Sequence, residues 1–193
     1  MNARSAANAR SAASARAAAP GDDRGHVIGF VVRLGAGWAI ATVVLALVPQ
    51  IEGSMVAGTV ASVAAAIRLA GMRPEIAGNM IHVGATGLRI IPECTPMMPF
   101  LMFAIALAAH PGDPRWKLIG IAAGAVLLWA FNVLRTLALM ATLARWPNAF
   151  RFVHVYLWQT VTLLAVAGLF LAWLRFAPRV PRAPAPRTDA PAA

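Results

Sequence analysis

Residues 118–143 read LIGIAAGAVLLWAFNVLRTLALMATL, and this stretch decides the fold. It is apolar along nearly its whole length, and Asn132 and Arg135 are its most polar side chains. A helix of about 20 apolar residues crosses the roughly 30 Å hydrocarbon core of a bilayer. The stretch therefore predicts a transmembrane helix that carries two polar groups near its end.

Other parts of the chain have the same character. Hydrophobic residues make up 60% of the sequence and charged residues 12%. Further apolar runs of membrane length or slightly less are Val27–Val48, Thr95–Ala109 and Val155–Leu174. We therefore expect an all-α integral membrane helix bundle with about four transmembrane helices.

Two segments between the first and second of these runs are harder to assign. Ser54–Gly71 is rich in Ala and Val but contains Arg68, so it is either a weak span or an interfacial helix. Residues 79–91 are β-branched and are broken by Gly84 and Gly87, which predicts a small extracytoplasmic β-hairpin.

Polar tails are expected at both ends. Residues 1–26 are rich in Ala, Arg and Ser and predict a disordered basic tail, and residues 176–193 predict a disordered Pro/Ala/Arg tail. The membrane-embedded domain is then residues 27–175. Its first run is too long for a typical signal peptide, and Val48-Pro49-Gln50 is a poor cleavage site, which favours a retained anchor.

The positive charge predicts the topology. The net charge is +10, and the basic residues gather in the tails and loops without interleaved aromatic residues, a pattern that argues against nucleic-acid binding. Basic residues near span ends favour the cytoplasm. Both tails and the loop around residues 115–117 share one side only if Ser54–Gly71 does not cross. We expect four spans in the inner (plasma) membrane, with both termini cytoplasmic, although Arg145 and Arg151 fall on the outer side.

Cys94 is the single cysteine of the chain. A lone thiol forms no internal disulfide and builds no multi-thiolate zinc site, so no metal and no cofactor is implied. The residue lies in Ile91-Pro92-Glu93-Cys94-Thr95-Pro96, where a polar stretch gives way to an apolar run. This boundary position favours chemistry over packing.

Helix lengths place three reactive side chains in one layer. At about 1.5 Å per residue, the helical rise is about 24 Å over residues 94–110, about 27 Å over residues 117–135 and about 31 Å over residues 154–175. Each value is about one membrane thickness. Because residues 110, 117 and 175 mark cytoplasmic ends, we expect Cys94, Arg135 and His154 to lie together at the extracytoplasmic face.

Each of these residues also has a simpler interpretation. A buried lone cysteine often acts as a small hydrophobe. Arg135 near a helix end can extend its guanidinium to the interface. His154 can belong to an interfacial aromatic belt with Tyr156 and Trp158. Their shared layer, and the polar stripe that Asn132 forms with Arg135, favour a functional site.

The set suits acyl transfer. A thiol attacks a carbonyl as the thiolate, which a neighbouring imidazolium or guanidinium stabilises. His154 is suited to protonate a leaving amine, and Arg135 to hold a carbonyl and stabilise its oxyanion. The products are a thioester intermediate and a released peptide. A site at the outer membrane face selects a membrane-held substrate.

The order of Cys94, Asn132-x-x-Arg135 and His154 resembles the exosortase/archaeosortase family of membrane-embedded protein-sorting enzymes, over roughly residues 27 to 175. The resemblance implies a cysteine protease or transpeptidase with Cys94 as nucleophile, His154 as acid/base and Arg135 as transition-state stabiliser; Asn132 is a candidate for substrate binding. Its expected partners are membrane lipids and secreted proteins that end in a short motif, a hydrophobic helix and a basic cluster.

The chain departs from many members of that family in two respects. Thr95-Pro96 follows the cysteine where many relatives have Ser-Gly, and Pro96 has no N–H to donate. The chain is also a short, core-only version. The alternative function is a non-catalytic membrane subunit of an exopolysaccharide export or assembly system, in which Cys94 packs and Arg135 pairs with Glu93 or a lipid headgroup.

Overall fold

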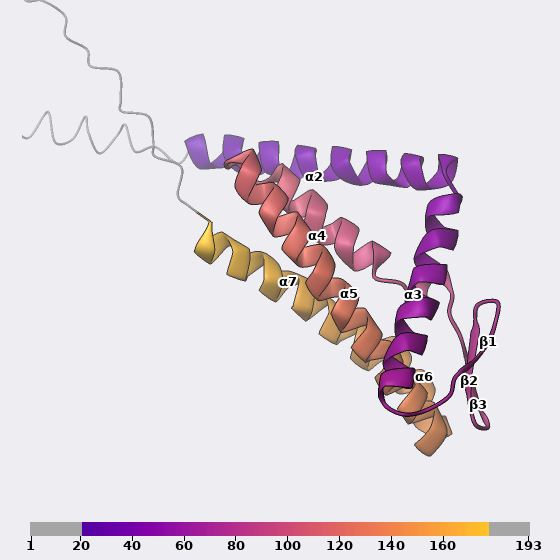
Figure 1. Ribbon diagram of the computed structural model, residues 1–193. Coiled ribbons are helices and arrows are strands. Elements are labelled where there is room, and N and C mark those ends of the chain that lie inside the picture. The colour runs from indigo at the N-terminus through magenta and orange to yellow at the C-terminus, as the bar shows by residue number, and fades with distance from the viewer. Residues whose placement is uncertain (1–20, 178–193) are drawn as a thin grey trace, which may run out of the picture.

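The computed structural model describes residues 21–177, and most of them are helical (Figure 1). The helices are α2 (Gly21–Leu47), α3 (Gln50–Leu69), α4 (Met97–Ala109), α5 (Pro114–Arg145), the single-turn α6 (Phe150–Phe152) and α7 (Trp158–Phe176). Residues 21–26, expected in the N-terminal tail, belong to α2. The tails expected at residues 1–20 and 178–193 lie outside the described residues.

Helix α5 shows how local sequence sets a boundary. Asp113 is its N-cap, and the Asp113 carboxylate accepts a hydrogen bond from the Arg115 backbone N–H at 2.8 Å. Pro114 occupies the first helical position, where no N–H is needed. The apolar run then continues for 32 residues to Arg145. This length places Arg135 far from the capped end.

The membrane-bundle fold is confirmed, with a difference in which helices qualify as spans. By length and hydropathy, four helical segments of the described chain can cross a membrane. They are Val27–Leu47, Gln50–Leu69, Pro114–Arg145 and Pro147–Phe176. Helix α4, expected as a span, has 13 residues and rises only about 20 Å. The segment around residues 54–71, expected as a weak span or an interfacial helix, forms α3, which has 20 residues and is longer than α4.

Helix α3 nevertheless runs differently from its neighbours. Figure 1 shows α2, α4, α5 and α7 running along the bundle. Helix α3 turns sharply away from the end of α2 and runs across the end of the bundle that carries the sheet. Its buried face, with Val60, Val63 and Ile67, packs into a core shared with the sheet and α5. The Trp129 indole N–H donates to the Ser62 hydroxyl at 3.0 Å, which ties α5 to α3.

A small antiparallel sheet follows α3. Its strands are β1 (Glu75–Ala77), β2 (Met80–Val83) and β3 (Thr86–Arg89), in the order β1-β2-β3. The expected hairpin is confirmed, and β1 adds a third strand. Gly78 and Gly84 adopt positive φ in the two turns, which suits glycine. The His82 imidazole covers its cross-strand partner Gly87, where a Cβ would lie 2.6 Å from that ring.

Two cores hold the bundle. One lies at the sheet end and includes Ile81, Ile90, Cys94 and Met140. The other joins α4, α5 and α7 around Phe103 and Leu128, where a Cβ on Gly124 would clash with the Phe103 ring. In Figure 1 the start of α2 and the end of α7 lie at the bundle end opposite the sheet. The sheet end therefore carries Cys94, away from both ends of the described chain.

Candidate active site

Cys94 ends a short 3₁₀ turn, Pro92–Cys94, between the sheet and α4. Ile90, which is fully buried, anchors the chain just before this turn. The residue itself is 8% exposed and its thiol is free. The turn thus presents an unpaired sulfur from the sheet-end core, at the start of α4.

The backbone N–H groups of residues 94–97 are engaged or absent. The Cys94 N–H donates to the Ile91 carbonyl at 2.8 Å, and the Thr95 N–H donates to the Pro92 carbonyl at 3.1 Å. Pro96 has no N–H, and the Met97 N–H donates to the Thr95 hydroxyl at 3.4 Å. That hydroxyl donates in turn to the Pro92 carbonyl at 2.7 Å. Residues 94–97 therefore offer no free backbone donor to an oxyanion.

Asn132 connects α5 directly to this turn. Its side-chain Nδ2 donates to the Cys94 carbonyl at 2.9 Å, and the residue is 3% exposed. Thr136, one turn later, donates from its hydroxyl to the Asn132 carbonyl at 2.9 Å and is also buried. Asn132, the candidate for substrate binding, thus has its amide nitrogen engaged with the backbone of the cysteine.

Arg135 lies three residues after Asn132 and points into the protein. It is 7% exposed, and its Nε atom is buried without a hydrogen-bond partner. Asn132, one helical turn earlier, is hydrogen-bonded to the Cys94 carbonyl, so Arg135 lies on the side of α5 that faces the cysteine, and the segment that carries His154 packs on α5. Such burial does not fit a side chain that extends to the interface, nor one that pairs with a lipid headgroup. Glu93, the other partner considered, is exposed.

His154 lies in a π-helical segment, Val153–Leu157, that leads into α7. Its ring stacks on Phe150 with centroids 5.5 Å apart and planes at 3°, and its Nδ1 atom is buried without a partner. Stacking fixes the ring plane while the nitrogen stays free. Segments of π-helix are rare and occur frequently at functional sites. The sequence pattern gave no sign of this segment.

The four sequence-predicted residues thus come together at the sheet end, from the Pro92–Cys94 turn, α5 and the segment before α7. They supply a thiol, a fixed amide, a buried cation and an oriented imidazole. Within residues 21–177, no group of three His, Cys, Asp or Glu side chains is arranged to hold a metal ion. The arrangement is chemically suited to nucleophilic attack by sulfur with charge stabilisation by Arg135.

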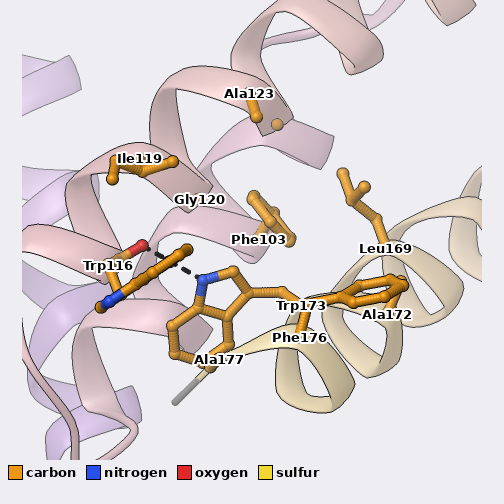
Figure 2. Close-up of a pocket in the computed structure, with 11 residues that line it drawn as sticks. Phe103, Trp116, Ile119, Gly120, Ala123, Leu169, Ala172, Trp173, Phe176 and Ala177 are labelled. Carbon is orange, nitrogen blue, oxygen red and sulfur yellow. Dashed lines mark hydrogen bonds between the residues drawn. The ribbon is translucent and has the colours of Figure 1, made fainter.

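A second feature lies toward the opposite end of α5. An open pocket of about 210 Å³ lies between α4, α5 and α7, and Figure 2 shows Trp116, Phe103 and Trp173 around it. The Trp173 indole N–H donates to the Trp116 carbonyl at 3.2 Å. The lining is apolar and carries no nucleophile. We interpret it as a packing defect between helices that this hydrogen bond joins.

Comparison with known proteins identifies one family. The family model described as transmembrane exosortase matches residues 29–173, which is more than half of the chain and includes all four site residues. No curated protein and no solved structure shows significant similarity to the chain.

Proposed function

Because the chain belongs to the transmembrane exosortase family, we propose that it is a membrane cysteine protease and transpeptidase that cleaves the C-terminal sorting signal of secreted proteins. Family membership supports a protease-like or transpeptidase-like role in general. The proposal adds that Cys94, Arg135 and His154 carry the reaction at the extracytoplasmic face, through a thioester intermediate.

The observation that carries this proposal is the unpartnered Arg135 Nε atom, one helical turn after the residue that is hydrogen-bonded to the Cys94 carbonyl. Leaving a buried charged donor without a partner costs more than leaving a neutral one, so its retention needs a reason. A developing oxyanion on a bound carbonyl supplies the missing acceptor. Since the backbone donors of residues 94–97 are engaged or absent, Arg135 takes on this role alone in that part of the site.

The steps follow from these positions. The Cys94 thiolate forms a bond to the scissile carbonyl carbon, and the negative charge moves to the carbonyl oxygen beside Arg135. The C–N bond then breaks, and protonated His154 gives its proton to the leaving nitrogen. An acceptor amine or water next attacks the thioester, neutral His154 takes the proton, and the thiolate leaves.

Asn132 has a positioning role in this proposal. Its hydrogen bond to the Cys94 carbonyl fixes the turn that carries the thiol relative to α5, which carries Arg135. Small displacements of a nucleophile cost large factors in rate. Asn132 therefore sets the distance between thiol and guanidinium and does not itself touch the substrate.

Cleavage is tested directly by expressing the chain with a tagged secreted protein from the same genome that ends in an apolar helix and arginines. We expect loss of the C-terminal tag and a covalent adduct between the two proteins that neutral hydroxylamine releases, as it does thioesters. Retention of the tag on every such candidate, with the chain inserted in the membrane, would contradict the proposal.

Asn132→Leu is expected to lower kcat by about 10 to 100 fold, because the turn carrying Cys94 loses its link to α5. The Cys94 carbonyl loses its donor, which destabilises the protein by about 1–3 kcal/mol. Rates of processing over a range of substrate concentrations separate kcat from KM. Thr136→Val, on the same buried face, is the control and keeps its rate. A raised KM at unchanged kcat would instead assign Asn132 to substrate binding.

The topology of the proposal places both ends of the chain in the cytoplasm and Cys94 outside. A reporter that is active only outside the cytoplasm, fused after residue 193, is expected to stay inactive, and the same reporter inserted after Asn148 in the loop before α6 is expected to be active. An active reporter after residue 193 would reverse the orientation. Fusions after residues 48 and 72 show in addition whether α3 crosses.

A further inference from the structure

An open apolar hollow runs along α4, between α2 and α7. Its volume is about 830 Å³, and every residue that lines it is apolar or glycine. Helix α2 packs on α4, where Gly37 lies against Ile105, and does not close onto α7. The result is a groove with α4 as floor and α2 and α7 as walls, called the α2–α7 groove below.

The position of the groove, its continuation toward Cys94 and its lining indicate what it binds. Its floor, α4, begins three residues after Cys94, and its wall, α7, follows the segment that carries His154. Met102 lies about 12 Å of helical rise below Cys94, and Leu163 about 14 Å below His154. The groove therefore runs along the two helices that lead from the thiol and the imidazole into the membrane.

The groove also continues toward the thiol. Trp38 of α2 lines both the groove and a small neighbouring hollow. This small hollow shares the lining residues Thr42, Leu45 and Met98 with a further cavity of about 420 Å³. Met98 lies four residues after Cys94. Hollows along α2 and α4 thus extend from the groove toward the level of the proposed nucleophile, through a narrow point beside Trp38 and Met98.

The lining suits a helix. Gly35, Ala106 and Ala167 offer small surfaces on all three helices, which allow close backbone approach in a membrane. Met98 and Met102 are partly exposed along the same path, and methionine adapts its shape to varied partners. No charged group lines the groove, so it offers nothing to a soluble polar ligand. A membrane-held polypeptide satisfies its own backbone in lipid only as a helix or a closed barrel.

We propose that the α2–α7 groove binds the transmembrane helix of the substrate and so delivers the segment just outside that helix to Cys94. This inference rests on the proposed function, because it assumes that the membrane-held substrate is cut at Cys94. It explains why an open lateral groove leads along α4 and α7 toward the reactive layer. Binding along the groove fixes the height of the cut relative to the start of the substrate helix.

The test uses Gly35, because it lines the groove and a Cβ added there meets nothing within 4 Å. A photo-crosslinking amino acid replaces Gly35 in the full chain with Cys94→Ala. The probe is a tagged reporter that ends in the apolar helix and arginines of a secreted protein from the same genome. Gly168 on α7, equally open but outside the groove, is the matched control.

We expect crosslinks from position 35 to the reporter helix, and at most weak ones from position 168. In the chain with Cys94 intact, Gly35→Trp should lower reporter processing by about tenfold or more, as overpacking of a contact does, while Gly168→Trp changes it little. Crosslinks from position 35 to lipid alone, or to a second copy of the chain, overturn the proposal, as does unchanged processing by Gly35→Trp.

The same experiment separates the two proposals. If position 35 crosslinks the reporter helix but the intact chain never cuts it, the groove binds a helix and the proposed protease activity is wrong. If the intact chain and Gly35→Trp both cut the reporter at the same rate, the activity stands and the groove is not its docking site.

Discussion

Cys94→Ala should reduce processing of a tagged substrate to below about a thousandth of the rate of the unchanged chain, because no other group in the site replaces the thiolate. The fold should tolerate the change. Cys94 is one of many residues in the sheet-end core, and loss of one small group there costs about 1 kcal/mol. Gel analysis of the C-terminal tag measures the rate, and detergent melting measures stability.

A packing control separates chemistry from loosened structure. Ile90→Val removes one methylene from the same core, at a fully buried position, and also costs about 1 kcal/mol. It should keep its activity within about threefold. If Cys94→Ala retains the full rate, or if Ile90→Val loses as much as Cys94→Ala, then Cys94 only packs and the non-catalytic alternative regains support.

The shared layer of Cys94, Arg135 and His154 was predicted from helical rise together with the cytoplasmic ends that the basic residues indicate. Arg135 and His154 each lie about one membrane thickness along a helical stretch from a group expected at the opposite end, whereas Cys94 precedes α4, which rises only about 20 Å. Periodicity and length therefore predict the layer in which a side chain lies. The catalytic roles of these three residues stay predictions, because a layer does not specify a reaction.

Structural features that depend on contacts between segments distant in the chain could not be predicted from the local sequence pattern. The Asn132 hydrogen bond joins residues far apart in sequence, and the π-helical segment around His154 has no signature in composition. Strand β1 has only three exposed residues and forms through pairing with β2. Helix α3 lies across the bundle end because its apolar face fits the sheet, a tertiary effect that hydropathy does not record.

Arg135→Lys should lower kcat by about 10² to 10³ fold, which is the effect of losing one oxyanion donor. Lysine keeps the positive charge but loses the planar fork and the Nε–H donor that is buried without a partner. If Arg135 serves only as a cation near a membrane interface, lysine replaces it fully. The substitution therefore distinguishes directed hydrogen bonding from simple charge.

Separate measurement of kcat and KM distinguishes an oxyanion donor from a group that binds the substrate. A group that acts on the oxyanion lowers kcat with little change in KM, because the charge exists only in the transition state. Arg145→Lys, on the exposed last turn of the same helix, is the matched control and should change the rate less than about twofold. Membrane insertion and melting of both variants are measured in parallel. Full activity of Arg135→Lys would remove the oxyanion role, and equal losses in kcat for both variants would point to damage along α5.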